Sequence, residues 1–232
     1  MRSHAVGFSI GTKGYAGSGY ESLYPNVQDF WEYNPSTNVW TRKADVGGSN
    51  RDYAFGFSIG TKGYIGGGYN LTTHLFVADF WEYDPSTNVW TQKAGIGNRV
   101  YAVGFSIGTK GYMGLGYDGN GGAYPIDFWS YDPSTNAWTR KTDFPGMGRE
   151  NPAGFSIGTK GYIGTGAAWS IPALSDFWEY DPSTNAWTQK PDFGGAERRN
   201  AIGFSIGSKG YIGIGDNMVS PYYLNDFWEY SQ

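Results

Sequence analysis

Two series of charged residues recur along the chain at a regular spacing. Each arginine of the first series stands five residues before a Gly-Phe-Ser triplet, and each aspartate of the second precedes a Phe-Trp pair. The arginines are Arg2, Arg51, Arg99, Arg149 and Arg198, and the aspartates are Asp29, Asp79, Asp127, Asp176 and Asp226. Guanidinium and carboxylate groups form two-pronged hydrogen bonds, so the two series predict structural salt bridges. In the alternative interpretation some of the arginines stay free and bind an anion or a carboxylate.

The elements that position these residues come from an internal repeat. The segment Gly-Phe-Ser-Ile-Gly-Thr-Lys-Gly-Tyr begins at Gly7 and returns at Gly56, Gly104, Gly154 and Gly203, the last time with Ser208 in place of threonine. A period near 50 residues indicates a repeat architecture. We therefore expect a single domain over residues 1–232, with repeats at about 1–49, 50–97, 98–147, 148–196 and 197–232.

Each repeat predicts four short antiparallel strands. In the second repeat they cover residues 53–59, 64–68, 79–83 and 89–93, separated by turn residues such as Gly60-Thr-Lys-Gly63 and Asp84-Pro-Ser-Thr-Asn88. Aromatic residues occupy both faces of the third strand, which indicates a sheet that is covered on both faces. Sheets stacked around an axis meet this requirement. The sequence therefore predicts an all-β, five-bladed β-propeller whose last blade lacks its outermost strand.

The pattern of tyrosine, tryptophan and glycine resembles the kelch-repeat family. A tyrosine in the third strand is followed seven residues later by a tryptophan, as in Tyr83 and Trp90, and a Gly-x-Gly ends the second strand, as in Gly164 and Gly166. The resemblance implies a propeller and leaves function open, because the family includes scaffolds, adaptors and a few enzymes. Galactose-oxidase-like members use a copper cofactor that needs a Tyr-Cys crosslink. This chain has no cysteine, so we expect no cofactor.

The repeats differ from one another almost only in two of their connections. We call the four predicted strands of each repeat a, b, c and d in chain order. Because they are antiparallel, the nearly invariant a–b and c–d turns lie on one face and the b–c and d–a loops lie on the other. The variable loops carry aromatic and histidine residues, namely Tyr24, His74, Phe76, Tyr124, Trp169, Tyr222 and Tyr223. Loop drift alone would give the variation without the aromatic content, so we expect a ligand-binding face. The arginines from Arg51 to Arg198 begin on the same face, where they should surround the mouth of the central channel.

Composition limits the classes of binding partner that the chain is expected to have. The formal net charge is -4 with no basic run, which argues against nucleic acid, and no apolar stretch is long enough to span a membrane. The absence of cysteine excludes disulfides and leaves the compartment open. The leading hypothesis is a non-enzymatic module that binds a protein segment or an extracellular ligand. The alternatives are a glycan-binding module and, with less support, a hydrolase or epimerase with a polar site at the channel mouth.

The fifth repeat predicts an open sheet edge. Its third strand, 226–230, has no predicted fourth strand beside it, and an unpaired strand edge can pair with another chain. We expect a monomer with a three-stranded fifth blade, and edge association as the alternative. A closed ring would place Arg2–Ile10 beside Ala201–Ile206.

Overall fold

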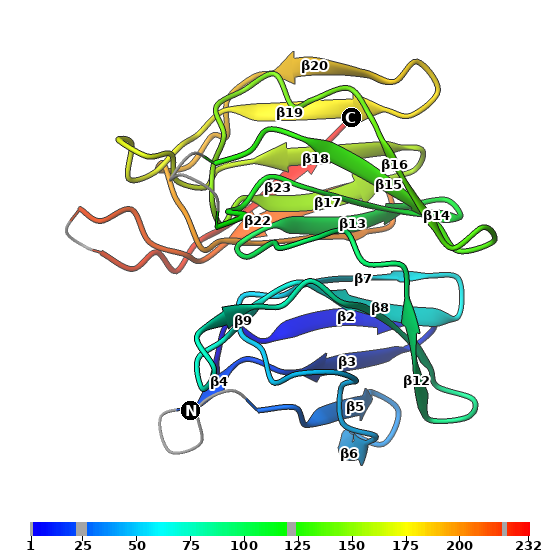
Figure 1. Ribbon diagram of the computed structural model, residues 1–232. Coiled ribbons are helices and arrows are strands. Elements are labelled where there is room, and N and C mark those ends of the chain that lie inside the picture. Colours follow the sequence, from blue (N-terminus) through cyan, green and yellow to red (C-terminus); the bar gives the residue numbers. More distant parts are fainter. Residues whose placement is uncertain (1, 22–26, 120–123, 220–221) are drawn as a thin grey trace. The chain divides into compact units, whose positions relative to one another are not determined.

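The computed structural model describes residues 2–21, 27–119, 124–219 and 222–232, and every regular element in these ranges is a β-strand (Figure 1). Most strands form five antiparallel sheets, one from each repeat. Blade 1 has the order β2 (Val6–Ile10), β3 (Lys13–Gly17), β5 (Phe30–Asn34) and β6 (Val39–Lys43). Blade 2 has the order β7 (Phe55–Ile59), β8 (Lys62–Gly66), β11 (Phe80–Asp84) and β12 (Val89–Lys93).

The later sheets repeat this order. Blade 3 comprises β13 (Val103–Ile107), β14 (Lys110–Gly114), β15 (Phe128–Asp132) and β16 (Ala137–Arg140). Blade 4 comprises β17 (Ala153–Ile157), β18 (Lys160–Gly164), β19 (Phe177–Asp181) and β20 (Ala186–Lys190). Blade 5 has only β21 (Ile202–Ile206), β22 (Lys209–Gly213) and β23 (Phe227–Ser231). Two small two-stranded sheets also form: β1 (Arg2–Ser3) pairs with β4 (Tyr20–Glu21), and β9 (Tyr69–Asn70) forms a hairpin with β10 (Leu75–Phe76).

This arrangement confirms the predicted fold class, a five-bladed β-propeller with a three-stranded last blade. The chain forms two compact units. The first is Met1–Val100 with Asp132–Trp138, and the second is Tyr101–Tyr131 with Thr139–Gln232. The first unit holds blades 1 and 2, coloured from blue through cyan to bluish green in Figure 1, and the second holds blades 4 and 5 with most of blade 3. No helix capable of crossing a membrane occurs in the part of the chain that the structure describes.

The invariant turns form for local reasons. In the a–b turn of blade 2, Gly60 has a φ of 57°, a left-handed conformation that suits glycine. In the c–d turn that follows, the Asp84 carboxylate accepts the backbone N–H of Ser86 at 2.9 Å, and Asn88 takes the left-handed position with a φ of 56°. The corresponding aspartate and asparagine of the other turns behave in the same way. These contacts fix the register of strands c and d.

The core lies between neighbouring blades, where the strand-d tryptophans Trp90, Trp138 and Trp187 each occupy a pocket that we call the tryptophan socket. Trp90 packs edge-on against Phe30 of blade 1, with ring centroids 5.0 Å apart, and belongs to a cluster with Val46, Ile65 and Tyr83. Its indole N–H donates to the carbonyl oxygen of Ala44 at 3.1 Å. The strand-d tryptophan of blade 2 therefore packs against the neighbouring blade.

The same socket recurs in other blades. Trp187 packs against Phe128 and Phe144 at 4.9 and 5.2 Å, and its N–H donates to the carbonyl of Thr142 at 3.0 Å. Trp138 packs against Phe80 at 5.1 Å and donates to Ala94 at 2.8 Å. Each socket therefore joins two consecutive blades through aromatic contacts and one indole hydrogen bond.

Candidate binding surface

The series arginines are internal supports of the variable loops. Arg149 is fully buried, and its Nη1 and Nη2 atoms lie 2.5 and 2.7 Å from the two carboxylate oxygens of Asp176. It also donates to the carbonyl oxygens of Met147 at 2.9 Å and Thr165 at 3.0 Å. Its guanidinium group is thus taken up by Asp176 and Thr165 of blade 4 and by Met147 in the link that precedes the blade.

Arg51 and Arg198 repeat this geometry. Arg51 lies 2.6 Å from Asp79 and donates to the carbonyl of Gly67 at 3.1 Å. Arg198 lies 2.7 Å from Asp226, and its hydrogen bond holds the pKa of that carboxyl at about 2. Arg2 pairs with Asp29 as well, at 2.6 Å.

This geometry supports the salt-bridge interpretation of the arginine series. Arg99 is buried like Arg51, Arg149 and Arg198. Burial raises the pKa of Asp176, but the hydrogen bonds and charge of Arg149 outweigh it and hold that pKa below its usual range. A direct role of Arg51, Arg99, Arg149 and Arg198 in binding a ligand stays a prediction.

Arg149 and Arg198 also hold a strained backbone where the b–c loops of blades 4 and 5 begin. The residue whose carbonyl they bind has a positive φ: 61° at Thr165 and 54° at Ile214. A left-handed conformation is unfavourable for β-branched residues, so it persists only where surrounding contacts impose it. The next glycine, Gly166, donates its N–H to the backbone carbonyl of Arg198 in the following blade at 2.8 Å. The loops therefore leave the sheets from a fixed position.

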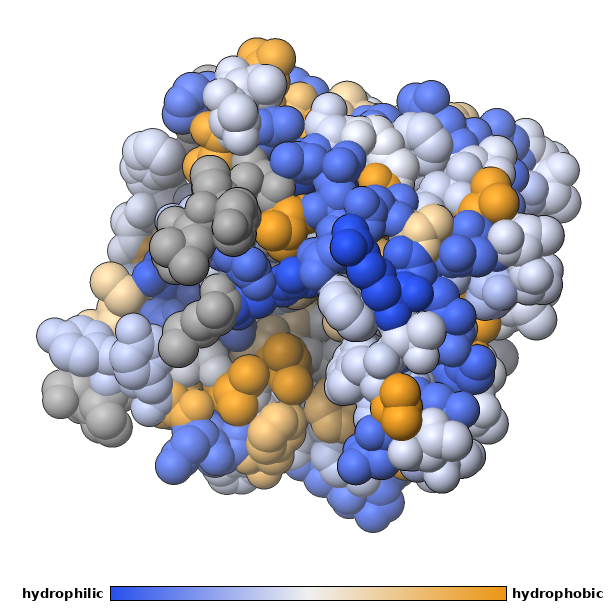
Figure 2. All heavy atoms as spheres, turned by 90° about the horizontal axis from the view of Figure 1, so that it is seen from below, coloured by the Kyte–Doolittle hydropathy of each residue, from blue (hydrophilic) through white to orange (hydrophobic). Residues whose placement is uncertain are grey.

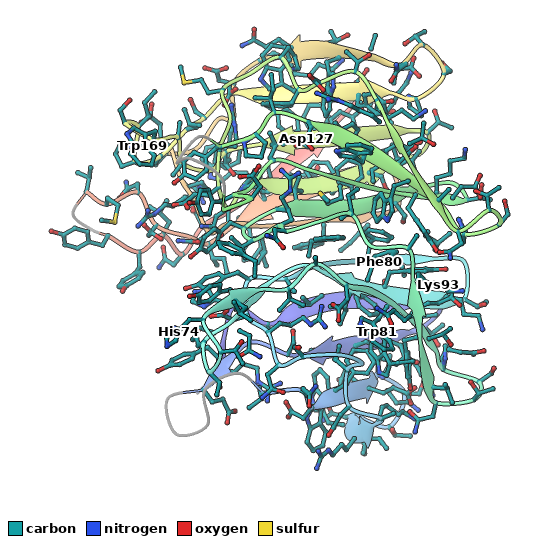
Figure 3. The ribbon with its side chains drawn as sticks, viewed as in Figure 1. His74, Phe80, Trp81, Lys93, Asp127 and Trp169 are labelled. Atoms are coloured by element: carbon teal, nitrogen blue, oxygen red, sulfur yellow. The ribbon has the colours of Figure 1, made fainter. Side chains whose placement is uncertain are left out.

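Three aromatic side chains of the variable loops come together in the second unit, and we call them the aromatic row: Tyr117, Tyr124 and Trp169. Tyr124 is central, with ring centroids 6.2 Å from Tyr117 and 6.4 Å from Trp169. Trp169 lies at the tip of a two-residue hairpin closed by mutual backbone hydrogen bonds between Ala168 and Ile171. It is 77% exposed and projects away from the strands of its unit (Figure 3).

Charged residues lie beside the aromatic row. Burial and then the charge and hydrogen bond of Glu150 raise the pKa of Tyr124 to about 12. Arg199 lies 3.9 Å from Glu150 and donates from Nε to Asp216 at 3.0 Å. Asn200 donates to the other Asp216 oxygen at 2.7 Å. A polar ligand group at this place would meet both carboxylates and a guanidinium.

Tyr222 and Tyr223 lie on the b–c loop of blade 5. Tyr223 is 84% exposed and forms a backbone bridge with Asp216, which connects it to the charged residues. Tyr222 is exposed as well, and its backbone carbonyl accepts the N–H of Asn217 at 3.3 Å. The two tyrosines therefore present exposed rings on a loop whose backbone is bonded to Asp216 and Asn217, beside the Arg199–Asp216 pair.

The first unit carries fewer of the predicted residues. His74 is exposed on the β9–β10 hairpin, where its backbone N–H donates to the carbonyl of Asn70 at 2.8 Å (Figure 3). On the same hairpin, Phe76 packs edge-on against Tyr69 at 5.4 Å. Tyr24 lies outside the described residues. Figure 2 shows a face on which small apolar groups are separated by hydrophilic residues, so apolarity alone does not mark a site there.

Sequence reasoning missed Tyr117, Glu150 and Arg199. Glu150 and Arg199 directly follow the series arginines Arg149 and Arg198, at a position occupied by serine, aspartate and valine in the first three repeats. That departure was a usable signal. The described residues contain no group of three or more histidine, aspartate or glutamate side chains that could hold a metal ion.

Comparison with known proteins supports the fold and leaves function open. No family model matches the chain, and no curated protein matches it. The chain is similar in structure to YjhT, with a TM-score of 0.82 and 15% sequence identity, over 100% of this chain and 82% of that one. At this identity the similarity concerns the fold alone. The class that the sheets define is the β-propeller.

Proposed function

We propose that the chain is a kelch-type binding module that takes its ligand on the variable b–c and d–a loops, with the second unit's aromatic row as the main contact. The observation that carries the proposal is Trp169, a fully projecting indole on a short, hydrogen-bonded hairpin. A large exposed aromatic on a rigid loop loses little conformational entropy on binding, and such residues dominate binding energy at interfaces.

A protein segment is the first candidate ligand. Interfaces are enriched in tyrosine and tryptophan and carry a polar rim, and the aromatic row has Glu150 and Arg199 at its side. A glycan is the second candidate, because the rings of Tyr124 and Trp169 could stack on sugar rings while Glu150 and Asp216 accept hydrogen bonds from hydroxyl groups. The geometry of the aromatic row and its charged neighbours fits both.

Screening the chain against an immobilised peptide library and a glycan array separates these candidates. For any binder found, Trp169→Ala and Tyr223→Ala should each weaken binding about tenfold or more, as loss of a central aromatic contact does. Lys62→Ala is the matched control, because Lys62 lies in an invariant turn and pairs with Asp84. Weakening by Lys62→Ala with unchanged binding by Trp169→Ala would place the site on the other face and overturn the proposal.

A further inference from the structure

Blade 5 contains an empty tryptophan socket. A cavity of about 170 Å³ is lined by Phe177 and Phe193 from blade 4 and by Ile212, Trp228 and Tyr230 from blade 5. Four of these residues occupy the repeat positions of the first socket, which are Phe30, Val46, Ile65 and Tyr83. In that socket the space is filled by Trp90.

The wall of the empty socket already has the geometry of the filled ones. Phe177 and Tyr230 lie edge to face, with centroids 5.0 Å apart at 66°. The corresponding pair Phe128 and Tyr180, which contacts Trp187, lies 4.9 Å apart at 72°. An indole could therefore enter without rearrangement of these rings, which lowers the cost of binding.

The strand beside the socket has a free edge. Among the described residues, β23 pairs only with β22, whereas the third strand of every other blade pairs on both sides. Such an edge presents backbone N–H and C=O groups that an extended peptide can pair with, and side-chain pockets beside the edge then give specificity.

Two acceptors beside the socket, a backbone carbonyl oxygen and a carboxylate, indicate which donors the added strand should carry. In the filled sockets the indole N–H donates to a backbone carbonyl of the preceding blade, as Trp90 does to Ala44 and Trp187 to Thr142. Pro191 occupies the equivalent position beside the empty socket, and a proline keeps its carbonyl oxygen. In blade 4 the lysine three residues after the tryptophan, Lys190, lies 2.9 Å from Glu179. Glu229 is the equivalent carboxylate in blade 5 and has Lys209 at 2.6 Å. It could accept a second lysine, as Glu32 does from Lys13 and Lys43.

We propose that blade 5 binds an extended segment of another polypeptide that carries Trp-x-x-Lys, which adds to the edge of β23 as a fourth strand and places its indole in the cavity between Phe177 and Tyr230. The three occupied sockets on this chain show the chemistry of the occupant. This site is separate from the loop surface of the proposed function and does not depend on it.

The test uses a fluorescently labelled peptide with the sequence of residues 181–190, Asp-Pro-Ser-Thr-Asn-Ala-Trp-Thr-Gln-Lys. Fluorescence anisotropy with the whole chain should show saturable binding. Replacing the peptide's tryptophan by alanine should weaken binding at least about tenfold, since a buried aromatic is lost. Replacing its lysine by alanine should weaken binding less, and mainly at low salt. Absence of binding at millimolar peptide, or equal affinity of the alanine peptide, overturns the proposal.

Protein variants locate the site. Tyr230→Ala should weaken binding of the peptide, whereas Tyr33→Ala, at the same strand position of blade 1, should not. Trp169→Ala should leave peptide binding unchanged, so failure here and failure of the loop-surface proposal are distinguishable. Light scattering addresses the remaining occupant: a mass that rises with concentration and falls when the peptide is added would show that a second copy fills the socket, against the proposal of a different partner.

Discussion

Asp52 is a buried aspartate that is only 1% exposed. Its Oδ1 atom has no hydrogen-bond partner among the described residues. It follows the series arginine Arg51, and its backbone pairs with Tyr69. Burial raises the pKa of Asp52 from 3.8 to about 6. Because burial penalises the charged form, this carboxylate destabilises the folded chain whenever it is ionised.

Asp52→Asn should therefore stabilise the chain in a pH-dependent way. Well below pH 3.8 the carboxyl is protonated in both the folded and the unfolded state, so the substitution should change the free energy of unfolding little. The gain should grow between pH 4 and 6 and reach about 2 kcal/mol above pH 6. Denaturant titrations at several pH values measure it. Asp192→Asn, at an exposed aspartate, is the control, and a gain that shrinks as pH rises would contradict the assignment.

Trp90 tests the energetic weight of an occupied socket. Trp90→Ala removes the contacts with Phe30 and Tyr83 and the hydrogen bond to Ala44, and it should lower the free energy of unfolding by roughly 3–5 kcal/mol. Trp40→Ala is the matched control, because Trp40 has the same strand position but is 53% exposed. Its cost should stay near 1 kcal/mol or below. A loss under 1 kcal/mol for Trp90→Ala would mean that the socket contributes little.

At the scale of the element, the strands and invariant turns were predictable because their causes are local. The turn after β11 follows from Asp84, Pro85 and Asn88, each of which prefers its position for reasons of backbone geometry or side-chain hydrogen bonding. The predicted strand at 89–93 coincides with β12. In the same sheet, Glu82 of β11 lies 3.1 Å from Lys93 of β12.

The loops were less predictable because their shapes depend on contacts between distant segments. The positive φ of Thr165 depends on Arg149, sixteen positions before it, and no local preference of threonine favours it. The aromatic row joins Tyr124 and Trp169 from two different repeats. Aromatic content pointed to these loops, but which rings meet could be read only from the structure.

At the scale of the molecule, the chain is a series of similar repeats, and similar tryptophan sockets join neighbouring repeats. Stability in such repeat proteins is close to a sum of terms for each repeat and for each interface between neighbours. Trp90 and Trp187 make the same contact in two different sockets and share no partner: Trp90 contacts Phe30 and Tyr83, and Trp187 contacts Phe128, Phe144 and Tyr180.

The double variant Trp90→Ala/Trp187→Ala should therefore lose a free energy of unfolding equal to the sum of the two single losses, within about 0.5 kcal/mol, as substitutions without shared partners do. Denaturant titration of the two single variants and the double variant gives the three values, provided that each curve has one transition. Trp90→Ala/Phe30→Ala is the contrasting pair, because these two rings touch, and its loss should fall short of the sum by about 0.5 kcal/mol or more. Additivity in the touching pair, or strong coupling between the two sockets, would show that stability is not distributed socket by socket.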